Sequence, residues 1–373
     1  MPINITDIQK AVVRKALRNG HFDIIMDLHK INKDLFTQSE DEYDYAYYCK
    51  IAAFHGHLEC LKYLHENGCR WDEWTCAWAA KNGHIECLKY AYENGCPWNK
   101  NTCANAAQNG HLECLKYAHK NGCWDKWVSY WAARHLECLK YAHENGCHWD
   151  GKLCSDATRN GNLECLKYAH ENGCHWDGNT CNTAAQYGHL ECIKYAHENG
   201  CSWDEWTCEC AARNGHLECL KYAHENGCHW NEQTCSAAAS KGHLECLKYA
   251  HENGCSWNKW TCIWAAEKGH IECLKYAHEN GCPWDNWAYY EAVKKNHIEC
   301  IKWFHENGCP CTKNFLSIIV KKILIPKWRA AVKSRQIIIY WMELGAQTSC
   351  AENGRARIED INSFENDFNN LIL

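Results

Sequence analysis

The sequence predicts an all-α fold, a curved α-solenoid of stacked antiparallel helix pairs, from three observations. A Gly-His step recurs every 27 residues, at Gly56, Gly83 and Gly110 and again further along the chain. Apolar residues after each step, such as Leu58 and Leu61, have the spacing of one helix face. A second glycine then ends each apolar stretch. Helices of about 8–11 residues are unstable alone, so the repeats must stack to bury their apolar faces.

Composition indicates a folded protein that stays inside a cell. The 373 residues are 46% hydrophobic and 23% charged, which excludes a disordered polar chain. The net charge of −6 lacks the basic excess of most nucleic-acid-binding proteins. Residues 1–10 are polar where a signal peptide would be apolar, and no apolar stretch approaches the roughly 18 residues of a membrane span. We therefore expect an intracellular, cytoplasmic protein without a signal peptide or membrane span.

The repeats divide the chain into three parts. Residues 1–55 form a degenerate amino-terminal repeat or cap, residues 56–311 the repeat array, and residues 312–373 a helical carboxyl-terminal cap and tail. Together the complete and degenerate copies predict 11 helix pairs. The unit that starts at Gly110 has 24 residues instead of 27, because it lacks one loop residue and the Asn-Gly that precedes the histidine elsewhere.

The first helix of each unit is expected over residues equivalent to 75–82. Asp72, or an asparagine in other units, lies just upstream as an N-cap. Paired alanines, Ala79 and Ala80, allow a neighbouring helix to come close. Gly83 then ends the helix and permits the turn.

The second helix is expected over residues equivalent to 57–67. Leu58, Leu61 and Leu64 share one face. Gly68 suits the left-handed position at the end of the helix. A Cys-x-Trp segment then leads to the next unit.

These residues resemble the ankyrin repeat. Thr75, Ala79, Ala80, Gly83 and His84 match, in order, the family's Thr-Pro-Leu-His-x-Ala-Ala and Gly-His pattern. Cysteine and tryptophan stand where the family has its proline and first histidine. The match covers about residues 20–311, and its reiteration makes it specific.

The units are shorter than the roughly 33 residues of the family. The six missing residues lie between Cys69 and Thr75, where the family carries a β-hairpin finger. We therefore expect these fingers to be largely absent. Shortened, Cys- and Trp-rich units are similar to ankyrin-type arrays of amoeba-infecting large DNA viruses and of amoebae. The resemblance implies a viral or amoebal source, and the host cytoplasm as the location if it is viral.

The cysteines fall into three recurring classes. Ten follow Glu in the second helix, as Cys60 does; ten follow the glycine at its end, as Cys69 does; and eight lie in the first helix, as Cys76 does. Equivalent cysteines in stacked layers would be about 8–10 Å apart, which exceeds the reach of a disulfide bond. The pattern favours small buried side chains that fill the core.

Metal binding is the alternative for these cysteines. His57 and Cys60 lie one helical turn apart, and this His-x-x-Cys pairing recurs in most units. A zinc site needs four converging ligands, commonly with a Cys-x-x-Cys spacing that the sequence lacks. A zinc-binding structural or buffering protein is therefore an alternative function, while the leading interpretation includes no metal and no other cofactor.

Two histidines and one tryptophan recur at positions with expected structural roles. The histidine after each Gly, such as His84, is expected to hydrogen-bond across the turn. His251 and its equivalents lie near the end of the second helix, where they suit a surface or capping role. Trp257 and its equivalents follow the loop cysteine in nine units, which predicts packing between layers.

Other tryptophans vary from unit to unit, unlike the nearly invariant second helix. They lie just before the first helix or within it, and in the family resemblance these segments line the concave surface that binds partners. Aromatic side chains at variable positions favour a binding surface. The candidate protein-binding residues are Trp74, Trp78, Trp127, Trp131, Trp206, Trp260, Trp264 and Trp287.

The predicted function is therefore a non-catalytic protein–protein interaction scaffold or adaptor with an unidentified protein partner. No nucleophile–base pair, phosphate loop or carboxylate dyad stands apart from the repeat, so we expect no enzyme and no small-molecule substrate. A further alternative is nucleic-acid binding by a basic cap, because residues 312–335 carry Lys and Arg without Asp or Glu. The candidate residues of this cap are Lys321, Lys322, Lys327 and Arg329.

Overall fold

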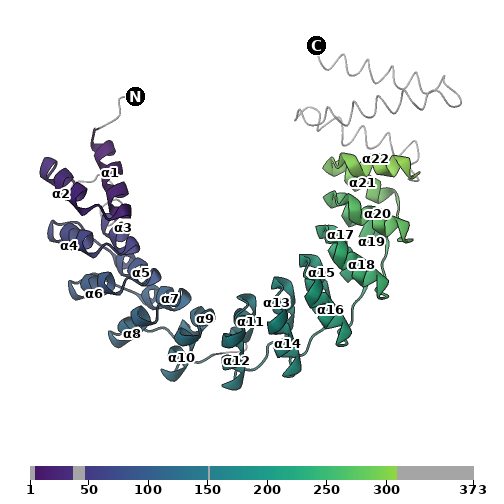
Figure 1. The fold of residues 1–373 in the computed structure, drawn as a ribbon, viewed down its shortest axis with the longest axis horizontal. Coiled ribbons are helices and arrows are strands. Elements are labelled where there is room, and N and C mark those ends of the chain that lie inside the picture. The colour runs from purple at the N-terminus through teal and green to yellow at the C-terminus, as the bar shows by residue number, and fades with distance from the viewer. Residues whose placement is uncertain (1–4, 37–46, 150–151, 309–373) are drawn as a thin grey trace, which may run out of the picture. The chain divides into compact units, whose positions relative to one another are not determined.

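The computed structural model describes residues 5–36, 47–149 and 152–308. This part of the chain contains 22 helices in eleven successive pairs and no strand. The all-α solenoid and the number of helix pairs are therefore confirmed. The chain divides into two compact units, residues 1–203 and 204–373, in each of which the helix pairs follow one another in chain order (Figure 1).

Each pair consists of a first helix and a second helix. In the first unit the first helices are α1 (Ile5–Asn19), α3 (Tyr47–His55), α5 (Glu73–Lys81), α7 (Lys100–Gln108), α9 (Val128–Ala132), α11 (Lys152–Arg159) and α13 (Thr180–Tyr187). The second helices there are α2 (Phe22–Ile31), α4 (Leu58–Glu66), α6 (Ile85–Glu93), α8 (Leu112–Lys120), α10 (Leu136–Glu144), α12 (Leu163–Glu171) and α14 (Leu190–Glu198). In the second unit the first helices are α15 (Glu205–Asn214), α17 (Glu232–Lys241), α19 (Lys259–Lys268) and α21 (Asn286–Lys295). Their partners are α16 (Leu217–Glu225), α18 (Leu244–Glu252), α20 (Ile271–Glu279) and α22 (Ile298–Glu306).

Most first helices begin two residues earlier than the sequence predicts. Helix α5 begins at Glu73 because the Asp72 side chain accepts a hydrogen bond, 3.1 Å long, from the Trp74 amide. Asn258 caps α19 in the same way, through the Trp260 amide at 3.0 Å. The tryptophans expected just before the helix therefore lie in its first turn, on a fixed backbone.

The second helices end in a Schellman arrangement. After α8, the Gly122 amide donates to the His119 carbonyl at 3.0 Å, and the Cys123 amide donates to the Ala118 carbonyl at 2.9 Å. Gly122 has a φ of +86°, a left-handed conformation that favours glycine. The cysteine that follows this glycine is consequently held against the end of the helix.

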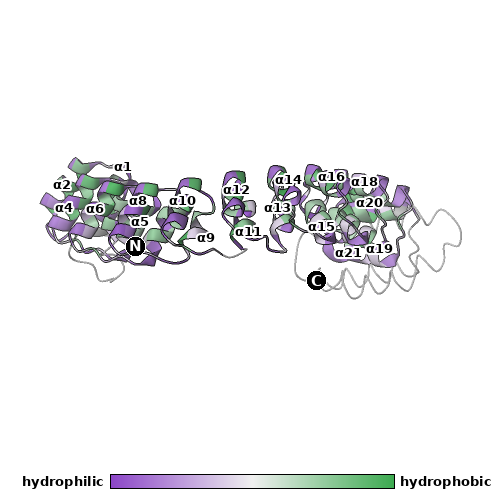
Figure 2. Ribbon diagram, turned by 90° about the horizontal axis from the view of Figure 1, so that it is seen from below, coloured by the Kyte–Doolittle hydropathy of each residue, from purple (hydrophilic) through white to green (hydrophobic). Residues whose placement is uncertain are grey.

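The core lies between the two helix layers. On α18, Cys246, Leu247 and Ala250 are buried, while Lys248 forms an exposed ion pair with Glu245 at 3.0 Å. First helices bury mainly Cys, Thr and Ala, whose short side chains let successive first helices approach more closely than successive second helices do. Within each unit the stack therefore bends toward the first-helix layer. In Figure 2 the helices carry both hydrophobic and hydrophilic residues, as expected of elements that bury one face.

Within each unit, the tryptophan that follows a loop cysteine packs between successive repeats, as predicted. Trp257 stacks on His251, with ring centroids 3.7 Å apart, and meets Tyr276 of the next repeat edge-on at 6.2 Å. His251 Nδ1 also lies 3.1 Å from the Tyr276 hydroxyl. The histidine near the end of the second helix therefore does more than cap the helix, because it joins one repeat to the next.

The histidine that follows each Gly also joins neighbouring repeats. His84 Nε2 donates a hydrogen bond to the Phe54 carbonyl at 3.1 Å. A Cβ atom on Gly56, whose φ is +76°, would lie 2.4 Å from His84 Nδ1. A hydrogen bond across the turn was predicted for this histidine. The bond reaches the preceding repeat because the ring lies over that repeat's glycine.

Burial of histidine rings makes the stability of the fold depend on pH. Desolvation is the largest cause that lowers the pKa of His55, His65, His84, His111, His224, His243 and His270. A lowered pKa means that the folded chain binds fewer protons than the unfolded chain, whose histidines titrate near about 6.5. The neutral histidine rings therefore stabilise the folded chain fully above about pH 6.5. This stabilisation is lost as the pH falls below that value. We expect Tm to fall between about pH 7.5 and about pH 5.5.

The chain itself supplies a control for this pH dependence. Asn162 occupies the histidine position in its own repeat, and its Nδ2 donates to the Arg134 carbonyl at 2.7 Å. His84→Asn should therefore keep a hydrogen bond to Phe54 while removing one titrating ring. Melting curves across this pH range should show a weaker dependence for the variant. An unchanged dependence would mean that His84 binds protons equally in the folded and unfolded chains.

Candidate functional site

Exposed aromatic side chains are confined to one helix layer. Between Tyr47 and Glu306, every exposed large hydrophobic side chain of the described residues belongs to a first helix or its N-cap. These residues are Trp74, Trp127, Tyr130, Trp131, Tyr187, Trp206, Trp260 and Trp287. Because no second helix in this range carries an exposed large apolar side chain, the first-helix layer is the aromatic surface of the part of the chain that the structure describes.

Five of the predicted tryptophans share one position, the start of a first helix. Trp74, Trp206, Trp260 and Trp287 are the second residues of α5, α15, α19 and α21, and Trp127 is the N-cap of α9. Their exposed fractions range from 42% for Trp74 to 55% for Trp206 and Trp287. Each backbone amide donates to the side chain of an Asp or Asn two residues earlier. The rings are therefore displayed from a backbone that is already ordered.

The other three predicted tryptophans lie further along their helices and are less uniform. Trp78 is half-buried and packs edge-on against Phe54, with centroids 5.6 Å apart. Trp264 is also half-buried. Trp131 is 36% exposed and meets Tyr130 edge-on at 5.1 Å. Trp78 thus contributes to contacts between repeats, whereas Trp131 extends the aromatic surface.

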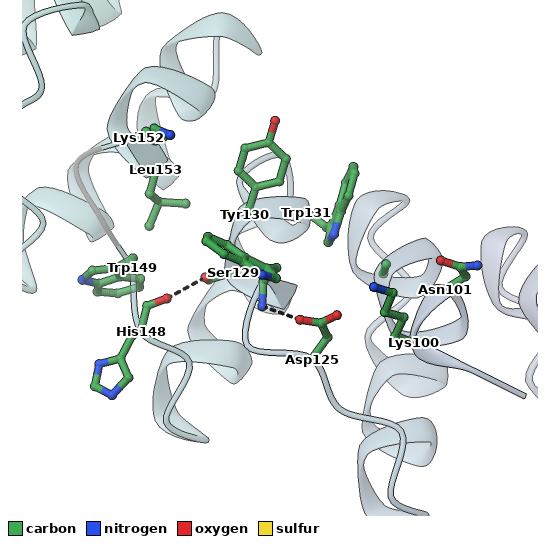
Figure 3. A pocket seen from close by; sticks show the side chains of 12 residues that line it. Lys100, Asn101, Asp125, Ser129, Tyr130, Trp131, His148, Trp149, Lys152 and Leu153 are labelled. Atoms are coloured by element: carbon green, nitrogen blue, oxygen red, sulfur yellow. Dashed lines mark hydrogen bonds between the residues drawn. The ribbon is translucent and has the colours of Figure 1, made fainter.

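A cavity of about 340 Å³ lies at the shortened repeat. Its walls include Trp127, the N-cap of α9. Figure 3 shows Tyr130 and Trp131 of α9, and Trp149 and Leu153 at the start of the next repeat. Helix α9 has five residues, whereas the first helices on either side, α7 and α11, have nine and eight. The shorter helix leaves space that a full helix would fill.

Of these lining residues, Trp127 and Trp131 were predicted from the sequence, whereas Tyr130 and the cavity were not. The signal was present in the sequence, because the only shortened unit of the array also carries the Tyr-Trp pair. Lys100, Lys152 and Asp125 also line the cavity. The lining is therefore aromatic, with charged side chains of both signs.

The described residues form no metal site and no membrane-spanning helix, and the predicted basic cap lies outside them. No three His, Cys, Asp or Glu side chains there come together as metal ligands. No helix in the same ranges is long and apolar enough to cross a membrane. Lys321, Lys322, Lys327 and Arg329 of the predicted basic cap lie outside the described residues, and so does the whole of residues 312–373.

Comparisons with known proteins identify the repeats. Residues 235–314 match a family model described as ankyrin repeats (3 copies), and residues 76–119 and 181–224 match one described as ankyrin repeats (many copies). The solved structures include the human ASB11 ankyrin repeat domain, which is 19% identical, with a TM-score of 0.37, over 43% of this chain and 85% of that chain. No curated protein matches the sequence.

Proposed function

Because this chain belongs to the ankyrin repeat family, we propose that it is a non-catalytic scaffold or adaptor that binds other proteins inside a cell. Ankyrin repeats generally mediate protein–protein interaction, and the family is typically non-enzymatic. The proposed binding surface is the first-helix layer, with the tryptophans of its amino-terminal turns as the main contacts.

The observation that carries this proposal is the one-sided placement of exposed aromatic side chains. Tryptophan and tyrosine are enriched among the residues that dominate binding energy. Exposed apolar patches on a folded protein commonly mark interaction sites. A capped helix start also holds the tryptophan backbone in place before binding, which lowers the entropy lost on association.

Variation between repeats supports the same surface. The positions of Trp74 and Trp78 are occupied by different residues in different units, while the second helix repeats almost verbatim. A common scaffold with a varied surface is typical of repeat proteins that recognise a specific partner. The cavity at α9 adds a recess for one bulky apolar side chain of that partner.

Replacing three exposed tryptophans of the second unit tests the proposal. We expect Trp206→Ala, Trp260→Ala and Trp287→Ala together to weaken partner binding at least about tenfold, because buried aromatic contacts in an interface commonly contribute 2 kcal/mol or more. Affinity capture from the native host, quantified by mass spectrometry, would identify proteins held by the unmodified chain and measure their loss.

A matched variant changes the opposite layer. Lys221, Lys248 and Lys275 are partly exposed on the second helices α16, α18 and α20, where each pairs with a glutamate. Alanine at these three positions should leave capture unchanged. Equal capture by the tryptophan variant and the unmodified chain would exclude the first-helix layer of the second unit as the binding surface.

A further inference from the structure

Cysteines of two different classes meet inside the helix pairs. The cysteine of a first helix contacts the cysteine that follows the second helix of the same pair, 20 residues later in the sequence. Cys103 Sγ lies 2.7 Å from Cys123 Sγ, and Cys154 Sγ lies 3.2 Å from Cys174 Sγ. Since a disulfide bond is about 2.05 Å long, its formation requires the sulfurs to move by only about 1 Å.

The same pairing recurs in eight helix pairs. Both cysteines are buried in each pair. In four of the other pairs, the first-helix Sγ lies 3.9–4.0 Å from the carbonyl oxygen of the loop cysteine. The pairs are Cys49–Cys69, Cys76–Cys96, Cys103–Cys123, Cys154–Cys174, Cys181–Cys201, Cys208–Cys228, Cys235–Cys255 and Cys262–Cys282. The helix pair α9–α10 differs, because Ser129 occupies the first-helix position and Cys147 the loop position.

Both members of a pair are held by regular backbone structure. Cys103 is the fourth residue of α7. The amide of Cys123 is fixed by its hydrogen bond to the Ala118 carbonyl. A disulfide bond tolerates only a narrow range of backbone separations, so two rigid positions with touching sulfurs favour this partner over any other.

We propose that these eight pairs are covalent modification sites, at which hydrogen peroxide converts two thiols into a disulfide bond within one helix pair. The loop cysteine, as its thiolate, attacks one peroxide oxygen and becomes a sulfenic acid. The hydroxide released takes up the proton that the thiol lost, giving water. The first-helix thiol then attacks the sulfenic sulfur and expels a second water. Two thiols and one peroxide thus give one disulfide and two waters, and a small thiol reductant reverses the change.

In the Cys235–Cys255 pair, the surroundings favour the loop cysteine as the first to react. Cys255 is 3% exposed, whereas Cys235 is fully buried. The hydrogen bond with Cys235 lowers the pKa of Cys255, which favours its thiolate. In contrast, burial raises the pKa of Cys246, on α18 of the same helix pair, to about 11. Narrow access also favours an oxidant of about the size of water over a bulky one such as glutathione disulfide.

The test is peptide mapping of the purified full chain after treatment with hydrogen peroxide. Catalase stops the reaction, and N-ethylmaleimide in denaturant then labels the remaining thiols. Before labelling, the intact mass should fall by about 2 Da for each disulfide, up to about 16 Da. Digests should contain links between cysteines 20 residues apart, while Cys147 and Cys246 carry the label. Links scattered among all classes, or no loss of mass at a dose that oxidises a free thiol in the same tube, would overturn the proposal.

Three variants make the assignment specific. Cys255→Ser should leave Cys235 labelled, whereas Cys246→Ser should keep the Cys235–Cys255 link. Ser129→Cys should add a ninth link, to Cys147, in the helix pair α9–α10. Far-ultraviolet circular dichroism checks that each variant is folded, and the unmodified chain tests the pairing independently of them. A ninth link formed by Cys147 with any other cysteine would contradict the geometry.

Discussion

Gly242→Ala should destabilise its repeat by about 3 kcal/mol, because two costs combine at this position. Gly242 has a φ of +79°, which an alanine adopts only with strain. A Cβ atom there would also lie 2.5 Å from Nδ1 of His270 in the next repeat. The imidazole would have to move away, and the contact between the two repeats would be lost. Native-state hydrogen exchange of α17–α20 amides measures the change locally.

A second glycine of the same repeat allows the backbone strain to be measured without the clash against the histidine ring. Gly254 has a φ of +87°, but a Cβ atom there would meet nothing within 4 Å. Gly254→Ala should therefore cost only the backbone strain, about 1 kcal/mol. Equal destabilisation by the two variants would show that the His270 ring moves aside at no cost in free energy. The ring would then not fix the spacing between repeats.

Trp257→Ala should lower the stability of the second unit by about 2–3 kcal/mol. The change removes the ring stacked on His251 at 3.7 Å and its edge contact with Tyr276 of the next repeat. It leaves a space between layers that short neighbouring side chains cannot fill. Thermal unfolding, together with exchange of α18 and α20 amides, would measure the loss.

Trp260, three residues further along, provides the comparison. It is 48% exposed, and its amide rather than its ring makes the capping hydrogen bond. Trp260→Ala should therefore change stability by less than about 0.5 kcal/mol, while weakening partner binding. If Trp260→Ala destabilised the fold as much as Trp257→Ala, its ring would have to be assigned to the core.

The fold could be predicted because residues typical of helix starts and helix ends recur in each repeat. Gly83 and His84 mark the turn, Asp72 marks the first helix, and the repetition of these residues identifies the family. The start of the first helix was misplaced by two residues, since a cap position is decided by a hydrogen bond to the Trp74 amide rather than by apolar spacing. The domain boundaries, the source of the repeats and the partner stay predictions.

The arrangement of the cysteines was harder to predict from sequence. The spacing of stacked layers predicts that equivalent cysteines lie too far apart for a disulfide bond. It does not predict the distance between cysteines of different classes. Cys103 and Cys123 meet because a helix and a Schellman turn converge within one pair. Likewise, the sequence shows that the unit starting at Gly110 is shorter than the others. The cavity depends instead on how many residues of this unit form helix α9. Five tryptophans were predicted to lie just before the first helix, whereas four of them lie in its first turn and Trp127 is an N-cap. Their exposure depended on three-dimensional packing.

The short helix α9 also limits the cooperativity of the first unit. Within this unit, it contacts α11 less than any other two neighbouring first helices contact each other. In a linear repeat array, unfolding of one repeat affects the next only through their shared interface. A weak interface therefore lets the repeats before α9 and those after α10 unfold at different denaturant concentrations. A single free energy of unfolding cannot describe such a unit.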